Sequence, residues 1–294
     1  MDLYDKVSGD CSKLITKHYS TSFSIGIRLL EKKTRKAIYA IYGFVRLADE
    51  IVDSFYNADQ MELLEKFKSD AFEAIDKGIS TNPVLHSFQW AVNSYSIERE
   101  LIDAFLYSME MDLYISNYTS DKYNKYIYGS AEVVGLMCLR VYYSGDNENY
   151  NQLKKPAQIL GRAFQQINFL RDLQDDYLKR GRIYFPGIDF DNLTQHEKAD
   201  IESDIEKNLR EAYLGIIMLR KGVRLGVYCA YVYYLQLFKK IKRTSADKLL
   251  ENRIRINNFY KIILMIKSIM IWWFSFYPRK PRIRGNFVPE EVVV

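Results

Sequence analysis

The sequence of 294 residues predicts an all-α protein. Three observations support this prediction. Apolar residues recur at helical spacing through long segments, and the alternation of β-branched residues that marks strands is nearly absent. Before residue 278 the only prolines are Pro83, Pro156 and Pro186, so long helices are permitted. With 48% hydrophobic and 15% aromatic residues, the chain can bury a sizeable core and is not expected to be disordered.

Helical segments follow one another along most of the chain. The first strongly periodic one runs from residue 31 to 55 without proline, with Ile38, Ile41, Val45 and Val52 on one side. Further helices are expected at residues 60–75, 97–118, 125–143, 159–177 and, in several pieces, 197–273. Residues 78–83 and 144–149 are typical of turns, and residues 180–192 form the one long irregular connection.

The chain is expected to form a single all-α domain over residues 1–277, because no linker composition interrupts it. Residues 278–294 contain three prolines and predict an extended basic tail. The first residues carry Asp2 and Asp5 without an apolar run, which is not the pattern of a signal peptide.

Charge and cysteine content indicate which kinds of partner and which cellular compartment to expect. The net charge of +5 is concentrated after Lys239, where lysines and arginines are interleaved with aromatics. Such a region suits a phosphate-bearing partner, although a solvated basic face is an equal alternative. It lacks a recognisable nucleic-acid-binding motif, so no nucleic-acid partner is expected. The cysteines Cys11, Cys138 and Cys229 form no CxxC pair, which fits a reducing cytoplasm.

Residues 259–277 form the most apolar segment, but they include Lys261 and Lys267. A spanning helix needs about 20 apolar residues with few charges. The segment therefore favours a buried or membrane-surface helix over a transmembrane one. Peripheral membrane contact is expected over residues 271–284, where aromatic and basic side chains adjoin: Trp272, Trp273, Phe274, Phe276, Arg279, Lys280, Arg282 and Arg284.

Two pairs of aspartates have the same local pattern. Asp49 and Asp53 are four residues apart with Arg46 one turn earlier, and Asp172 and Asp176 are four apart with Arg171 beside them. Residues four apart lie on one helix face, so each pair concentrates negative charge. If the two helices face each other, four carboxylates line one cavity and require cations. On spacing alone, the alternative that both pairs lie on solvated helix faces stays open.

The ligand types select the kind of cation. Oxygen ligands favour magnesium, or manganese, and magnesium commonly bridges carboxylates to substrate phosphates. A di-iron bundle would need Glu-x-x-His pairs. The three histidines follow Ile15, Pro83 and Leu193 at that spacing, which excludes such a site. Nearby arginines could hold diphosphate oxygens.

With these motifs the sequence resembles the squalene/phytoene synthase family of head-to-head prenyl transferases. The resemblance covers residues 8–258 and rests on blocks in the family's order: YSTSFSIGIRLL from Tyr19, AIYAIYGFVRLADEIVD from Ala37, YIYGSAEVVG from Tyr126, FQQINFLRDLQDDYLKRGRIYFP from Phe164, and later YCAYVYYLQLFKKI and ENRIRI. It implies an isoprenoid-synthase-type helical bundle around a central apolar cavity.

The resemblance also implies the roles of individual residues. The metal-binding acids would be Asp49, Asp53, Asp172 and Asp176. Substrate-binding positions would be Ser20, Ser22, Arg46, Gln165, Asn168, Arg171 and Arg253. Cavity tyrosines would be Tyr128 and either Tyr234 or Tyr233. Ser20 and Ser22 could instead be helix N-caps, Arg253 a surface arginine, and Asp175 is expected to be a supporting or surface acid.

Within the family, the sequence resembles the bacterial carotenoid branch in SAEVVGLMCLRV and GRIYFP. This implies Mg²⁺-dependent formation of phytoene from two geranylgeranyl diphosphates through a cyclopropyl diphosphate, with no NADPH expected. The alternatives are dehydrosqualene or squalene synthesis from two farnesyl diphosphates, and, in another class, a non-catalytic helical lipid-binding protein. The expected location is cytoplasmic, peripheral at the inner face of the membrane.

Overall fold

The computed structural model of the chain describes residues 2–251 and 253–276. Within these residues the chain is helical, and its one β feature is an isolated bridge between Asn117 and Ile183. The predicted all-α fold is therefore confirmed. The elements, in chain order, are α1 (Asp2–Tyr19), α2 (Thr21–Leu29), α3 (Lys32–Ser54), α4 (Gln60–Lys77), α5 (Pro83–Tyr95), α6 (Arg99–Tyr114), α7 (Ser120–Ile127), η1 (Tyr128–Glu132), α8 (Val133–Tyr142), α9 (Asn147–Gln174), η2 (Asp175–Lys179), η3 (Phe190–Asn192), α10 (Gln195–Met218), α11 (Lys221–Lys242), α12 (Ala246–Glu251) and α13 (Asn258–Phe276).

Local sequence signals account for many of the helix starts. Asp59, Asn82, Thr119 and Asp146 each cap a helix with a side-chain oxygen that accepts a backbone N–H. Thr194 and Glu197 form a reciprocal capping box at the start of α10. The expected helix over residues 31–55 is observed as α3, and the irregular connection over 180–192 is observed with one 3₁₀ turn.

Two of the predicted helices differ from expectation in a way that matters for the site. Residues 125–143 contain a π-helical turn, η1, between α7 and α8. This turn lies where α6 approaches most closely, since a Cβ on Gly129 would be 2.3 Å from the carbonyl oxygen of Ala104. Pro156 does not end a helix but lies inside α9, where its ring packs against Gly215 of α10. The wider π turn changes which side chains of residues 126–132 point inward.

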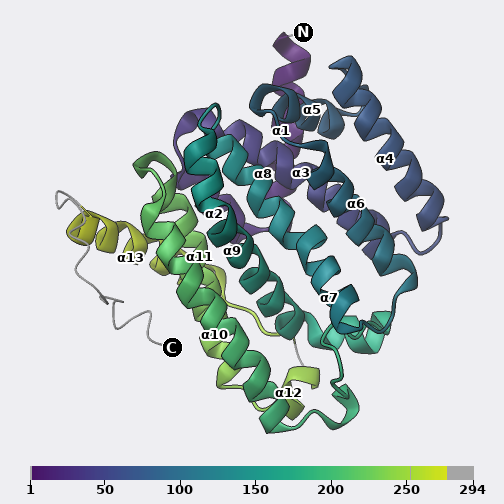
Figure 1. Cartoon of the computed structure of the whole chain (residues 1–294), viewed down its shortest axis with the longest axis vertical. Helices are drawn as coiled ribbons and strands as arrows, with labels where there is room; N and C mark the ends of the chain where they lie inside the picture. Colours follow the sequence, from purple (N-terminus) through teal and green to yellow (C-terminus); the bar gives the residue numbers. More distant parts are fainter. Residues whose placement is uncertain (1, 252, 277–294) are drawn as a thin grey trace.

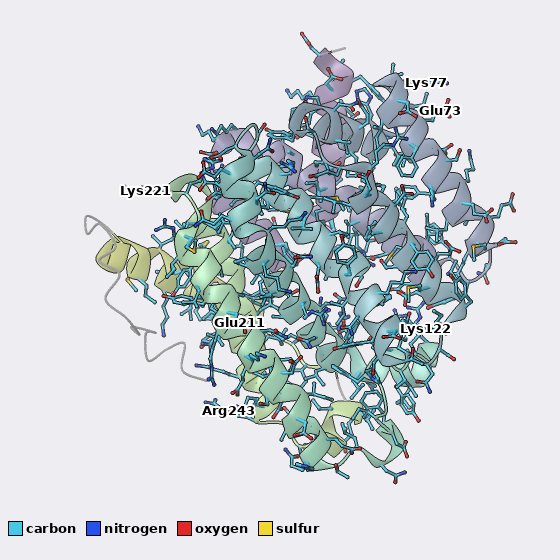
Figure 2. All side chains as sticks on the ribbon, in the orientation of Figure 1. Glu73, Lys77, Lys122, Glu211, Lys221 and Arg243 are labelled. Carbon is cyan, nitrogen blue, oxygen red and sulfur yellow. The ribbon has the colours of Figure 1, made fainter. Side chains whose placement is uncertain are left out.

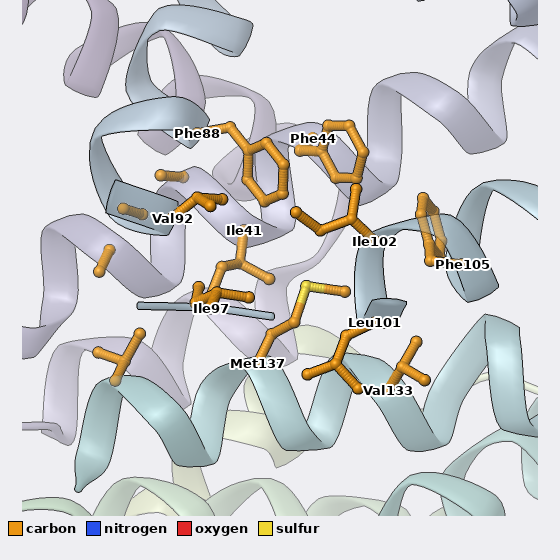
Figure 3. Packing of buried hydrophobic residues seen from close by; sticks show 14 of the residues in the cluster. Ile41, Phe44, Phe88, Val92, Ile97, Leu101, Ile102, Phe105, Val133 and Met137 are labelled. Atoms are coloured by element: carbon orange, nitrogen blue, oxygen red, sulfur yellow. The ribbon is translucent and has the colours of Figure 1, made fainter. Parts of the chain in front are cut away.

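The first core lies between α3, α5, α6 and α8 and is largely aliphatic around a stack of phenylalanines. The rings of Phe44 and Phe88 are parallel, with centroids 3.8 Å apart, and Phe105 packs at an angle to Phe44. Figure 3 shows these rings together with Ile102, Val133 and Met137 between the helices. This packed half provides a rigid wall for the helices that carry the site.

The second core joins α9, α10 and α11 and is rich in tyrosine. In Figure 1, α9 crosses the middle of the molecule with α8 and α10 beside it, and α13 projects from the α11 side. Many charged side chains are exposed at the surface, among them Glu73, Lys77, Lys122 and Glu211, which are labelled in Figure 2. Across the described residues, no helix combines the length and apolarity needed to cross a membrane.

The predicted boundary between a domain ending at residue 277 and a tail over 278–294 lies outside the described residues. The same holds for Arg279, Lys280, Arg282 and Arg284 of the predicted membrane-contact segment. The backbone of residues 272–276 completes α13.

Candidate active site

An elongated cavity of about 480 Å³ lies between α2, α3, α8, α9, α10 and α11. The helices present apolar residues at one end and charged residues at the other. Along α3 the lining changes from Ile38 and Ile41 to Asp49 and Asp53, and along α9 from Leu153 and Leu160 to Asp172 and Asp176. The two helices therefore carry their acidic ends to the same end of the cavity.

The two aspartate pairs lie together there, which is the arrangement that the spacing alone left open. The connection after η2 links them through arginine. Arg180 Nη1 lies 2.9 Å from Asp176 Oδ1, and its Nε lies 3.5 Å from Asp53 Oδ1. Arg182 Nη1 lies 2.9 Å from Asp53 Oδ1. The solvated-surface alternative is thus excluded for these four acids, which all line the cavity.

The three arginines identified from sequence lie at the same end. Arg171 is bidentate to Asp172, with its Nε 2.8 Å from Oδ1. Arg253 Nε lies 2.6 Å from the same carboxylate, so it belongs to the site although its side chain is 38% exposed. Arg46 Nη1 lies 3.6 Å from Asp49 Oδ2, and its guanidinium stacks 4.3 Å above the ring of Tyr19.

Two buried guanidinium nitrogens at this end make no hydrogen bond among the described residues. They are Arg46 Nε and Arg180 Nε, although Arg180 Nε lies within ion-pair distance of Asp53 Oδ1. A buried unpaired donor costs free energy, so an anion with oxygen acceptors would be stabilised here. Diphosphate oxygens have the required charge and geometry.

Asp112 and Arg182 form a part of the site that the sequence analysis missed. Both line the cavity and are buried. Asp112 accepts hydrogen bonds from the hydroxyls of Tyr118 at 3.0 Å, Tyr126 at 2.6 Å and Tyr184 at 3.0 Å. Arg182 lies 3.9 Å from Asp112 and donates to the carbonyl of Val52 at 3.3 Å. The sequence offered little signal for Asp112, because it has no acidic partner at i,i+4 in the segment 97–118.

Two acids carry an uncompensated negative charge. Burial raises the pKa of Asp49 to about 7; Arg46 opposes this shift and the neighbouring Asp53 adds to it. Burial and the proximity of Asp172 raise the pKa of Asp176 to about 7. The surrounding arginines therefore do not fully neutralise the carboxylates at this end of the cavity.

The polar stripe on α9 faces the cavity and meets α11. Asn168 donates to Gln165 Oε1 at 3.2 Å and accepts from the hydroxyl of Tyr234 at 3.2 Å. The Tyr234 ring stacks on Phe164 with centroids 3.9 Å apart. All four residues line the cavity, whereas Tyr233 does not, which settles the placement left open between the two tyrosines.

Three other residues need correction or refinement. Ser20 lines the cavity and also caps α2, since its hydroxyl accepts from Phe23 N at 3.2 Å. Ser22 does not line the cavity. Tyr128 was expected to be a cavity tyrosine, but it begins the π turn and packs outside the cavity; Tyr126 lines it instead. Asp175 is directed away to Lys179, at 2.6 Å, in agreement with the expectation of a supporting or surface acid.

The donor set fits a hard divalent cation in type, because the cavity end presents carboxylate oxygens and two of them are incompletely neutralised. Among the described residues, however, no three acid, histidine or cysteine side chains converge closely enough to hold a metal ion. The acids are instead drawn to arginines, as at Asp172 and Asp53. The predicted metal-binding role of the four aspartates thus stays a prediction.

Comparison with known proteins agrees with this geometry. The family model for squalene/phytoene synthase matches residues 16–260. The chain belongs to the squalene/phytoene synthase family. It is 29% identical to a phytoene synthase of Arthrospira platensis over 82% of this chain and 85% of that protein. It is 28% identical to a 4,4'-diapophytoene synthase of Staphylococcus haemolyticus over 65% of this chain and 66% of that protein.

The fold is that of the squalene/phytoene synthase family as well. A crystal structure of a dehydrosqualene synthase in complex with a ligand superposes with a TM-score of 0.78, 21% identity, and coverage of 93% of this chain and 98% of that one. The protein is therefore a prenyltransferase with the helical isoprenoid-synthase fold, of the family that joins prenyl diphosphates head to head.

Proposed function

We propose that this squalene/phytoene synthase family member condenses two molecules of geranylgeranyl diphosphate into phytoene in carotenoid biosynthesis, with release of two pyrophosphates. The observation that carries the proposal is the polarity of the cavity, which joins a carboxylate and arginine end to a long apolar remainder. A prenyl diphosphate has the matching shape, with a charged head and an apolar tail. The relative of Arthrospira platensis, named a phytoene synthase, supports the choice of substrate.

The arginines would bind the diphosphates. Arg46, Arg171 and Arg253 line the charged end, and the unpaired Nε of Arg46 is directed to no protein acceptor among the described residues. Guanidinium groups hold phosphate oxygens through paired, charge-assisted hydrogen bonds. Neutralising the leaving group is the main electrostatic requirement for ionising an allylic diphosphate.

The aspartates would hold the cation. Asp49, Asp53, Asp172 and Asp176 supply the oxygen ligands for Mg²⁺, with Mn²⁺ as an alternative. The bound cation would supply Lewis-acid neutralisation of the departing pyrophosphate. Arg171, Arg180 and Arg182 would hold the carboxylates of Asp172, Asp176 and Asp53 in position until the cation binds.

The rest of the cavity would protect the reaction from water. The first chain ionises, its cationic carbon is attacked by the double bond of the second chain, and a proton is lost to give a cyclopropyl diphosphate. That diphosphate ionises in turn, rearranges and loses a second proton. Such cations survive only where water is excluded. Phe23, Phe164 and Tyr234 line the cavity, and their rings would supply aromatic surface that stabilises positive charge.

Product analysis tests the proposal. Purified protein and Mg²⁺ are incubated separately with farnesyl and geranylgeranyl diphosphate, with and without NADPH, and the hydrocarbons are identified by mass spectrometry. We expect a C40 product from geranylgeranyl diphosphate that does not depend on NADPH. A C30 product alone would instead support the farnesyl alternative.

That alternative has a specific observation in its favour. The relative of Staphylococcus haemolyticus is named a 4,4'-diapophytoene synthase and is nearly as similar as the first relative, although over a shorter part of the chain. NADPH dependence of a C30 product would distinguish squalene from dehydrosqualene.

Peripheral membrane contact through α13 is a second part of the proposal. One stripe of α13 is apolar and exposed: Phe259 is 73%, Ile262 46%, Ile266 48% and Met270 48% exposed. The opposite side, with Leu264 and Ser268, is buried. The apolar stripe suits the acyl boundary of a bilayer, where a very apolar product must be delivered. We place the protein at the cytoplasmic face of the membrane.

Vesicle flotation tests this contact. The double substitution Ile262→Asp and Ile266→Asp in the full chain is expected to reduce binding to vesicles containing anionic lipid. Leu214→Asp on α10, where the native side chain is 54% exposed, serves as the matched control. Equal binding by both folded variants would contradict a role for α13.

A further inference from the structure

A second cleft lies beyond the apolar end of the substrate cavity, away from the aspartates. It has a volume of about 530 Å³ and is lined by polar residues that include Lys33, Tyr95, Asp146 and Arg220. The side chain that lines both this cleft and the substrate cavity is Tyr142. Tyr142 is therefore the partition between them.

Its position along the cavity follows from the helices. Tyr142 is the last residue of α8, whose lining residues begin at Ser130. The nearby ends of α2 and α10 contribute Leu30 and Leu219, and both lie next to the salt bridge of Glu31 with Arg220. On α3 the distance from Ile38 to Asp53 is 15 residues, or roughly 22 Å at the helical rise of about 1.5 Å per residue. Tyr142 thus closes the end of the cavity farthest from the charged groups.

The partition is held firmly. Arg220 Nε donates to the carbonyl oxygen of Tyr142 at 2.7 Å, and the backbone N–H of Arg220 donates to the hydroxyl of Tyr143 at 2.9 Å. Arg220 in turn is paired with Glu31 at the end of α2. Burial raises the pKa of the Tyr142 hydroxyl well above its ordinary value, as expected for a side chain that seals an apolar space. These contacts fix the backbone at the end of α8, from which the Tyr142 side chain projects.

We propose that Tyr142 is the stop that limits the length of the prenyl chain, and that the cleft behind it is the space into which a longer chain would extend if the ring were removed. The inference rests on the proposed function, because it assigns a specificity-determining residue to the same cavity. Replacing the ring by a small side chain joins the two spaces. Replacing it by a larger one shortens the cavity.

The test uses the full-length Tyr142→Ala and Tyr142→Trp variants and farnesyl, geranylgeranyl and geranylfarnesyl diphosphates. We expect Tyr142→Ala to raise the ratio of kcat/KM for the C25 substrate over the C20 substrate by about tenfold or more, since losing or adding space for a few carbons is worth 10–200-fold. We expect Tyr142→Trp to lower the ratio of kcat/KM for the C20 substrate over the C15 substrate. Tyr95→Ala is the matched control, because Tyr95 lines the cleft but not the cavity.

Unchanged ratios in both Tyr142 variants, with native circular dichroism, would overturn the proposal, as would an equal shift in Tyr95→Ala. The wild-type products test the proposed function separately. If the wild-type protein prefers farnesyl diphosphate, the proposal of geranylgeranyl diphosphate as substrate is wrong. The role of Tyr142 in limiting chain length is then tested by whether Tyr142→Ala shifts the preference toward the C20 substrate. If wild type forms no hydrocarbon, the binding ratio of geranylgeranyl to farnesyl S-thiolodiphosphate supplies the same comparison.

Discussion

The two ends of the substrate cavity differ in how they are built, although the same helices form both. At the charged end, Asp49, Asp53, Asp172 and Asp176 are held by arginines from the helices and from the connection after η2. At the other end, Ile38, Leu153, Leu219 and Tyr142 meet without any charged pair in the lining. Substitutions at the charged end should change the rate, whereas substitutions at the apolar end should change which substrate is accepted.

The largest effect is expected from Asp172→Asn. Asp172 holds Arg171 and Arg253, so losing its charge would disturb a proposed cation ligand and two arginines proposed to bind diphosphate. Turnover should fall by at least about 10³-fold, at the upper end of the loss for one electrostatic catalytic group. The matched control is Asp175→Asn, because Asp175 is paired with Lys179 and does not line the cavity. If Asp172→Asn retained turnover while remaining folded, the alternative of a non-catalytic lipid-binding protein would gain support.

A large effect on stability is expected from Arg182→Ala. The substitution removes the guanidinium partner of the buried Asp112 and leaves Asp53 with the longer contact to Arg180. Breaking a buried pair in this way costs about 3–5 kcal/mol of unfolding free energy. Urea unfolding of this variant should be compared with Arg99→Ala, whose exposed pair with Asp76 should contribute nothing measurable. A cost for Arg182→Ala below roughly 1 kcal/mol would show that the charged end does not depend on this arginine.

A smaller effect is expected where the charged end meets the apolar part. Tyr234→Phe removes the hydroxyl that donates to Asn168 but keeps the ring stacked on Phe164. The lost hydrogen bond to Asn168 is worth about 1 kcal/mol. If it helps to position the site for reaction, its loss should lower kcat/KM roughly five- to tenfold. Tyr233→Phe is the matched control, since that tyrosine lies outside the cavity lining. Equal effects of the two substitutions would indicate that the hydroxyl of Tyr234 has no role of its own.

A pH dependence of stability is also expected at the charged end. The pKa values of Asp49 and Asp176 are raised to about 7 in the folded protein, compared with about 3.9 for an unfolded aspartate. Between these values the folded state binds more protons, so both groups cost stability progressively as pH rises through this range, and the full cost is reached above pH 7. The apo-protein should therefore gain stability from these groups as pH falls from 8 to 5.

Mg²⁺ should accordingly raise the melting temperature more at pH 8, where both carboxylates are ionised, than at pH 5.5. Calorimetry at the two values measures this difference. Asp49→Asn should flatten the dependence, and an identical Mg²⁺ effect at both pH values in the wild type would argue against these acids as cation ligands.

Much of the charged end could be predicted from sequence because its pattern is local. Asp49 and Asp53, like Asp172 and Asp176, are one helical turn apart, so their common face follows from helix geometry alone. Arg46, Arg171 and Asn168 are within a turn of these acids, and Gln165 lies two turns before Asp172, so they could be placed in the same way. Arg253, far along the chain, came only from the resemblance and is confirmed in position by its contact with Asp172.

Other site residues had no local pattern. Asp112 gains its role from three tyrosines on other segments, and Arg182 from carboxylates on α3 and α6. Tyr128 was placed wrongly because a π turn shifts the inward positions of residues 126–132, and the close approach of α6 at Gly129 that accompanies this turn is a tertiary contact.

The sequence by itself determined that this chain is all-α, which two helices carry the acids, and which family's motifs it contains, because periodicity and i,i+4 spacing are properties of a single helix. Only the tertiary structure decided that the two acidic faces meet, that Arg180 and Arg182 join them, and that Tyr142 closes the opposite end of the cavity. These features depend on how separate helices pack against one another, and packing is set by contacts between residues far apart in the chain.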